Sequence, residues 1–216
     1  VIFIQWRWSL NYRDTLYGLA RMVGQLLAVG YVLVFLFESD NPIVISIVLL
    51  IMIAITSWIA LRPLDQSRPG LYWIALLSIT AGCVPVLMLA TQLVIDVEPW
   101  YAPHYLIPLA GMIFANSMNP LSIAGERYQA ELDHGHSHGK ARYIAMQTAM
   151  IPLVNSLMAV GLVSLPGMMT GQVLSGVSPL IAARYQILVM CMLFAASGIS
   201  AACFLTLWMR RSQRSS

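Results

Sequence analysis

Charged side chains are scarce in this sequence. Lys, Arg, Asp and Glu make up 10% of its 216 residues, whereas an average soluble domain carries about 25%. Hydrophobic residues account for 59%, so the chain has too little polar surface to cover a globule in water. The composition therefore excludes a soluble enzyme. It predicts an all-α, polytopic membrane protein with one transmembrane domain over residues 1–216.

Cysteines are also few, and the net charge is small. The three cysteines, Cys83, Cys191 and Cys203, all fall inside apolar runs, where we expect reduced thiols that pack and not a disulfide framework. The net charge is only +3, and the basic residues lie in short clusters between apolar runs. That pattern reports membrane topology and does not indicate nucleic-acid binding.

Long apolar runs dominate what is present. A bilayer core of about 30 Å needs about 20 helical residues to cross it. Because the chain opens on the apolar residues VIFI, we expect residues 1–4 to be the end of a further, truncated N-terminal span. Six segments have the required length: Leu16–Phe37, Pro42–Leu61, Leu71–Ile95, Tyr105–Ala124, Ile144–Leu165 and Ile187–Met209.

The loops between these segments differ in charge. The loops after the first and third spans contain acidic residues and no Lys or Arg, whereas the loops after the second and fourth spans and the C-terminal end are basic. If the spans alternate, eleven of the twelve basic residues fall on one side, and only Arg184 falls on the other. The positive-inside tendency then predicts that both ends of the chain are cytoplasmic.

Several kinds of chemistry have no residues to support them. The chain lacks a G-x-x-x-x-G-K-[ST] phosphate loop, so it cannot cradle ATP by itself. We find no Ser/His/Asp set on plausible elements and expect no catalytic residues, no bound cofactor and no enzyme activity in this chain. The span interiors contain no His, Asp or Glu, although a carrier driven by a proton gradient would normally use one.

Polar residues inside three spans form stripes. Asn116 and Asn119 share one helix face, Asn155 lies on a comparable stripe of the fifth span, and Arg21 and Gln25 are one turn apart in the first. Polar groups at membrane depth face the bundle interior, each other or water. They either hold helices together by hydrogen bonds or line a translocation path.

A histidine run lies between the fourth and fifth spans. In DHGHSHGK, His134, His136 and His138 alternate, and imidazole nitrogens bind Zn, Cu, Ni or Fe well. Two interpretations remain open: a solvated loop without a metal, or a loop that senses or delivers one. A transport site is excluded, because the spans supply no further ligands.

The stretch SLPGMMTGQVLSG, residues 164–176, fits neither a helix interior nor a solvated loop. Pro166 and Gly167 are expected to end a helix, after which Met168 and Met169 follow on a bent segment. Irregular backbone near the membrane is tolerated where protein buries it or where it lines a cavity. The stretch is therefore a buried turn or an outer gate. The two methionines suit a hydrophobic gate better than an iron site.

The sequence also resembles a known family. Residues 160–187, VGLVSLPGMMTGQVLSGVSPLIAARYQI, are similar to the signature of the FetB-type iron-exporter permeases and plant aluminium-tolerance permeases. The segments ARMVGQLLAVGYVL, IPLAGMIFANSMN and IPLVNSLMAVGLVSLPG match in order and spacing. The resemblance implies the inner-membrane permease subunit of a bacterial ATP-binding-cassette transporter that exports iron or a related metal ion. It also implies two copies in the bilayer, paired with a separate ATPase subunit.

The segment between the fourth and fifth spans departs from this family, because it is shorter and lacks an LGA-type docking motif. A carrier driven by an ion gradient and a metal-sensing scaffold that transports nothing remain the alternatives. The candidate site residues fall in three groups: the path (Arg21, Gln25, Asn116, Asn119, Asn155), the outer gate (Pro166, Gly167, Met168, Met169, Gly171, Gln172) and the ATPase-coupling loop (Glu126, Arg127, Glu131, Arg142).

Overall fold

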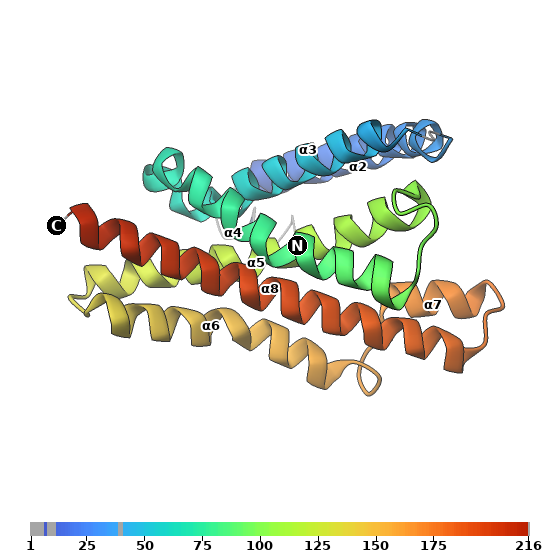
Figure 1. Ribbon diagram of the computed structural model, residues 1–216. Helices are drawn as coiled ribbons and strands as arrows, with labels where there is room; N and C mark the ends of the chain where they lie inside the picture. The colour runs from blue at the N-terminus through green and yellow to red at the C-terminus, as the bar shows by residue number, and fades with distance from the viewer. Residues whose placement is uncertain (1–6, 8–11, 39–40, 216) are drawn as a thin grey trace. The chain divides into compact units, whose positions relative to one another are not determined.

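The computed structural model describes residue 7 and residues 12–38 and 41–215, and the regular elements in these ranges are all helices (Figure 1). This confirms the all-α fold. The expected remnant of a further span at residues 1–4 lies outside the described residues. The elements are α2 (Tyr12–Phe37), α3 (Pro42–Ala60), the 3-10 helix η1 (Arg62–Ser67), α4 (Arg68–Met88), the π-helix η2 (Leu89–Val94), α5 (Pro103–Asp133), α6 (His138–Ala159), α7 (Gly167–Leu174) and α8 (Pro179–Ser215).

The chain forms two compact units, Val1–Ile45 and Ser46–Ser216. The described part of the first unit consists of α2 and the beginning of α3. Arg21 and Gln25 lie on α2, and their spacing of four residues places them on one face of that helix. The second unit contains the remaining helices and the structure described from here on.

Five of the six expected spans match described helices that qualify as membrane spans, and they follow in the expected order. Five segments are long and apolar enough to cross a bilayer: Thr15–Phe37, Pro42–Ala60, Gly70–Val94, Pro103–Asp133 and Pro179–Gln213. The remaining expected span is α6, whose 22 residues are less apolar. At 1.5 Å per residue it is about 33 Å long, which is also sufficient to cross a core of about 30 Å.

The helix ends differ from the expected span ends. α5 continues nine residues past Ala124 to Asp133, and α8 begins at Pro179 instead of Ile187. α6 ends at Ala159, six residues before Leu165. Hydropathy detects only the part of a helix that lies in hydrocarbon, whereas backbone hydrogen bonds extend a helix into the polar headgroup region.

Helices α4, α5 and α8 form the core of the second unit. α4 packs against α8 and α5, α5 also packs against α6 and α8, and α7 packs against α8. Where α4 meets α8, Gly82 lies against Ser200 and Ala196. Beside this contact the Cys83 thiol donates to the Ser117 hydroxyl at 3.3 Å and lies 3.6 Å from the Ser200 hydroxyl. Small residues thus let these three helices approach closely.

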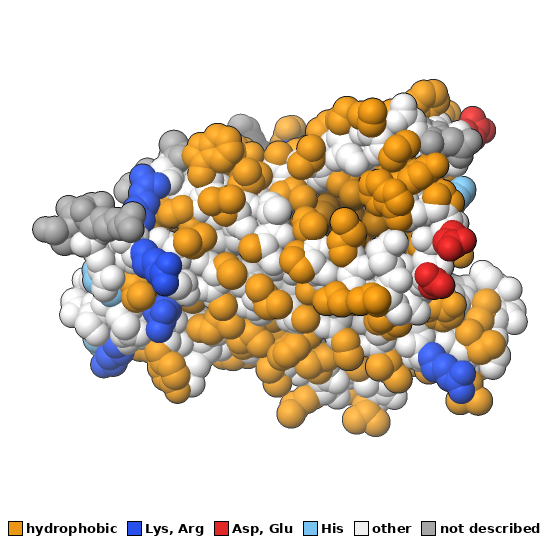
Figure 2. Space-filling view, viewed as in Figure 1, with side chains coloured by type: hydrophobic (Ala, Val, Ile, Leu, Met, Phe, Trp, Pro, Cys, Tyr) orange, Lys and Arg blue, Asp and Glu red, His pale blue; other side chains and the backbone are white. Residues whose placement is uncertain are grey.

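The helix directions place the basic residues at one end of this unit. α4 runs antiparallel to α8, because Gly70 lies against Arg211 while Gly82 lies against Ser200. Figure 2 shows Lys and Arg side chains gathered at the end where α8 finishes and α6 starts. We call this the basic end. Its described basic residues are Arg62, Arg127, Lys140, Arg142, Arg210 and Arg211, whereas Arg184 lies near the opposite end of α8.

Candidate translocation cavity

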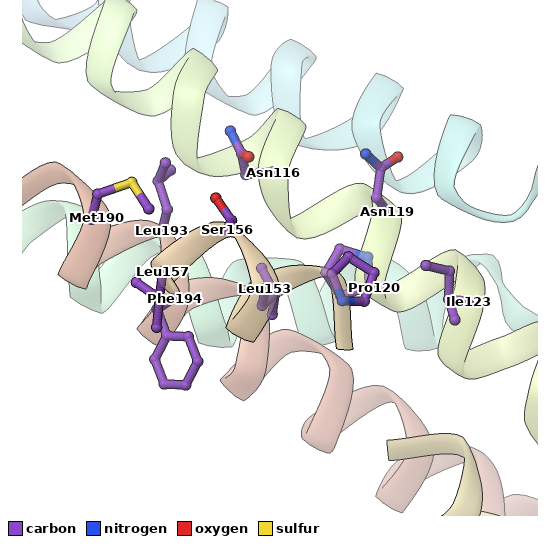
Figure 3. A pocket seen from close by; sticks show the side chains of 11 residues that line it. Asn116, Asn119, Pro120, Ile123, Leu153, Ser156, Leu157, Met190, Leu193 and Phe194 are labelled. Atoms are coloured by element: carbon purple, nitrogen blue, oxygen red, sulfur yellow. The ribbon is translucent and has the colours of Figure 1, made fainter. Parts of the chain in front are cut away.

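A cavity of about 140 Å³ lies between α5, α6 and α8 at membrane depth. Asn116, Asn119 and Ser156 are exposed on its walls, so it opens to the surface of the unit and has room for several water molecules. Figure 3 shows the side chains that line it. The lining residues are Asn116, Asn119, Pro120, Ile123, Pro152, Leu153, Ser156, Leu157, Met190, Leu193 and Phe194.

Two prolines add backbone oxygens to the polarity of this region. Pro120 lies inside α5 and Pro152 inside α6, and both line the cavity. A proline has no N–H, so the carbonyl four residues earlier loses its helical donor. The carbonyl groups of Asn116 and Thr148 are the ones affected. In α5 the same turn therefore combines a polar side chain with a backbone oxygen that lacks its helical donor.

The amide of Asn116 is held in one orientation. Its Nδ2 donates to the carbonyl of Met112 at 2.9 Å, one turn earlier on α5. The side-chain oxygen therefore remains available as an acceptor. The amides of Asn116 and Asn119 project from the same side of α5, and Ser156 of α6 lies near Asn116 (Figure 3). The cavity thus offers two amides and a hydroxyl in otherwise apolar surroundings.

The donor set of the cavity is neutral. Its oxygen groups can replace part of a hydration shell, but no acidic side chain is present among its lining residues to hold a cation firmly. Within the described ranges, no group of three or more His, Cys, Asp or Glu residues is placed to hold a metal ion. Passage through a membrane requires sites weak enough for the solute to leave, and the cavity is chemically suited to a solute in transit.

The structure brings together only part of the predicted path. Asn116 and Asn119 line the cavity, whereas Asn155 is exposed on α6 and does not line it. The neighbouring Ser156 takes that place. Arg21 and Gln25 lie on α2 in the first unit, and their part in the path stays a prediction. Sequence reasoning missed Ser156 and the two prolines, although an in-span proline four residues from a polar residue, as in Asn116–Pro120 and Pro152–Ser156, was a usable signal.

The predicted outer gate forms a short helix of its own. α6 ends at Ala159, and a tight turn follows in which Gly161 has φ +82° and donates its N–H to the Ser164 carbonyl at 2.9 Å. Pro166 therefore precedes the start of α7 and does not end a helix, contrary to the expectation from sequence. Gly167, Met168, Met169, Gly171 and Gln172 all lie on α7, which packs against α8. Their role as a gate stays a prediction.

The predicted coupling segment is largely helical. Glu131, near the end of α5, is buried, and its two oxygens have different partners: Oε1 pairs with Arg127 at 2.5 Å, and Oε2 lies 2.5 Å from Nδ1 of His136. The contacts of Glu131 with Arg127 and His136 hold the α5–α6 turn against the last turns of α5. Glu126 and Arg142 are exposed. Two of the four predicted coupling residues, Arg127 and Glu131, are thus part of a single ion-paired cluster.

The three histidines of the run contact three different partners. His136 binds Glu131, the Nδ1 of His134 lies 2.6 Å from the Ala130 carbonyl, and the Nδ1 of His138 lies 3.0 Å from the Tyr128 hydroxyl. Tyr128 is itself buried, with its ring centroid 5.0 Å from that of Trp208 on α8. The three histidines thus contact residues of α5 near the α5–α6 turn. Their side chains do not come together around a common position where a metal ion could bind.

Comparison with known proteins adds sequence relatives. The sequence model of the uncharacterised protein family UPF0014 matches residues 1–212. The chain is 38% identical to the UPF0014 membrane protein slr1647 of Synechocystis, over 93% of this chain and 83% of the relative. It is 31% identical to the probable iron export permease protein FetB of Escherichia coli, over 90% and 80%. It is also 31% identical to the protein ALUMINUM SENSITIVE 3 of Arabidopsis thaliana, over 87% and 72%. No solved structure matches the chain.

Proposed function

Because the chain belongs to the UPF0014 family of membrane proteins, we propose that it is the membrane permease subunit of a transporter that exports iron or a related metal cation. The observation that carries this proposal is the open cavity between α5, α6 and α8. Its walls combine two amides, a hydroxyl and proline-interrupted helices at membrane depth. A protein that only anchored other proteins would have no need of such polar groups in hydrocarbon.

The similarity to FetB supports the direction and the cargo, since that relative is named a probable iron export permease protein. The metal cation is the substrate of this transporter and not a resident cofactor. The neutral lining of the cavity would replace part of its hydration shell during passage. In this proposal Asn116, Asn119 and Ser156 contact the cargo, and α7 acts as the outer gate.

Energy would come from a separate ATP-binding-cassette ATPase, because the sequence lacks a phosphate loop. In this proposal the chain lies in a bacterial inner membrane, and the part of α5 beyond Ala124 and the turn to α6 supply the docking element at the basic end. The positive-inside tendency supports a cytoplasmic position for that end. The Glu131 cluster would make this element stiff enough to transmit force to the cavity. Two copies of the permease and two of the ATPase complete the transporter.

The test has two steps. The full-length protein is first purified in mild detergent from its own host, and the proteins that accompany it are identified by mass spectrometry. A stoichiometric ATPase subunit is the expected result. Its absence, with a control transporter isolated intact, would favour a carrier driven by an ion gradient or a scaffold that senses metal.

The second step measures metal flux in vesicles that contain the complex. The double variant Asn116→Ala, Ser156→Ala is expected to lose most of its ATP-dependent iron flux. Asn155→Ala, which removes an amide at a similar depth outside the cavity, is expected to keep it. Equal flux in all three proteins would exclude the cavity as the path.

A further inference from the structure

A groove runs along the outer face of α6 from the basic end toward the middle of the membrane. Its first part, about 240 Å³, lies between α6 and α8 and is lined by Arg142, Tyr143, Met146, Ala202, Leu205 and Thr206. Its second part, about 550 Å³, continues along α6 and is lined by Tyr143, Met146, Gln147, Met150 and Ile151. The two parts share Tyr143 and Met146, so they form one continuous groove.

The charged end of the groove has an unmatched positive charge. Arg142 is exposed there, and none of the described residues that line either part is acidic. Arg210 is also exposed and lies one turn beyond Thr206 on α8, on the face of α8 that borders the groove. Neither guanidinium forms an ion pair within the described part of the chain. Two cations from two helices thus flank the mouth of an apolar groove.

The length of the groove matches one leaflet of a bilayer. From Arg142 to Ile151 the chain advances nine residues along α6, which is about 13.5 Å at 1.5 Å per residue. Half of a hydrocarbon core of about 30 Å is about 15 Å. A molecule with a charged head at Arg142 and a tail ending near Ile151 would therefore span one leaflet.

A hydrogen-bond donor lies at the intermediate depth. Gln147 Nε2 donates to the hydroxyl oxygen of Tyr143 at 2.9 Å, which leaves the Tyr143 O–H free to donate outward. Tyr143 follows Arg142 directly, at the level where a phospholipid carries its ester carbonyl groups. Those carbonyls are acceptors, and the acyl chain beyond them would lie against Met146, Met150 and Ile151.

We propose that this groove is a binding site for an anionic phospholipid, whose phosphate lies between Arg142 and Arg210 and whose acyl chain follows α6 to Ile151. The charge of the mouth fits an anionic headgroup, and the apolar length fits an acyl chain of the same leaflet. This inference assigns Arg142 to lipid instead of to the contact with an ATPase. It does not depend on the proposed transport activity.

The experiment is native mass spectrometry of the delipidated full-length protein with added phosphatidylglycerol or phosphatidylcholine of identical acyl chains. Phosphatidylglycerol is expected to bind more tightly. One basic residue near an anionic headgroup is worth about a fivefold change in affinity, so Arg142→Gln is expected to weaken phosphatidylglycerol binding about fivefold. Arg142→Gln combined with Arg210→Gln is expected to weaken it about twenty-five-fold. Arg184→Gln, at the opposite end of α8, is the matched control and is expected to change nothing.

Two further experiments test whether something other than a phospholipid occupies the groove. Soluble glycerol phosphate is expected not to displace the lipid, because it lacks the acyl chain; displacement would mean a phosphate site and would overturn the proposal. Ile151→Cys tests for a second copy in the groove. Disulfide-linked dimers of this variant in membranes would show that protein fills the groove and would also overturn it. Equal binding of the two lipids, or unchanged binding by Arg142→Gln, would have the same consequence.

Discussion

Gly82 of α4 lies so close to Ser200 of α8 that a Cβ at position 82 would come 2.2 Å from the Ser200 hydroxyl oxygen. It would also come 2.7 Å from the Ser200 backbone nitrogen and 2.9 Å from the Ala196 carbonyl oxygen. Backbones in such contact cannot slide past each other without separating first. α4 and α8 therefore pack at close range in the second unit.

The first prediction concerns this contact. Gly82→Ala is expected to lower the free energy of unfolding by about 1–3 kcal/mol, because backbone atoms and not a flexible side chain must give way. Thermal unfolding of the purified protein in detergent would measure the change. Gly139→Ala is the control, since nothing lies within 4 Å of a Cβ built there. Equal unfolding midpoints for the two variants would contradict the close approach of α4 and α8.

The second prediction concerns the buried thiol. Cys83→Ala removes a hydrogen bond to Ser117 and a contact with Ser200, and it is expected to destabilise the protein by about 0.6 kcal/mol, the average for such bonds between membrane helices. Cys191→Ala, at an exposed position, is expected to have no measurable effect. Chemical unfolding of both variants would compare them. A larger effect at Cys191 would show that its face is covered in the intact protein.

The third prediction separates transport from stability at Pro120. Pro120→Ala restores an N–H donor to the Asn116 carbonyl and favours the helix by up to about 3 kcal/mol. We expect an unfolding midpoint that is unchanged or raised, together with reduced metal flux in vesicles, because the free carbonyl beside the cavity is lost. Pro108→Ala makes the same change in α5 at an exposed position outside the cavity. If both variants transported metal as well as the unmodified protein, the carbonyl would have no role.

The fourth prediction concerns the α5–α6 turn. Glu131→Gln removes the charge that Arg127 and His136 share, so residues 134–138 are expected to exchange their amide hydrogens faster. Hydrogen exchange followed by mass spectrometry would detect the change. Asp133→Asn is the control, because the exposed Asp133 accepts a hydrogen bond from Gln129 on its own helix, at 2.9 Å, in place of a contact with the α5–α6 turn. Unchanged exchange in Glu131→Gln would mean that backbone contacts alone hold the turn.

Two of the polar residues in the candidate site, Asn116 and Asn119, could be found from the sequence. Asn116 and Asn119 stand out because amides are rare in hydrocarbon and a spacing of three residues places them on one face of a helix. Asn155 fulfils the same criteria but does not line the cavity. Periodicity defines the faces of one helix, but the rotation of α6 against α5 decides which face meets the cavity. That rotation depends on side-chain packing across the interface.

The histidine run shows the same limit. Its composition fits a metal-binding loop as well as a solvated one, and the sequence offers no means to choose. In the structure its members contact Ala130, Glu131 and Tyr128 separately. These partners lie within ten residues of the histidines, yet they become partners only because α5 continues as a helix to Asp133 and the chain then turns back into α6.

The sequence by itself determined that the chain is a helical membrane protein, the order of its spans and the side on which its basic residues collect. These properties follow from the cost of placing charge and unpaired backbone in hydrocarbon, which acts on each segment separately. Only the tertiary structure decided that Ser156 and not Asn155 faces Asn116, that Glu131 fastens the α5–α6 turn, and that Arg142 opens onto an apolar groove. Those relationships join different helices or turns, and they arise from packing at contacts such as that between Gly82 and Ser200.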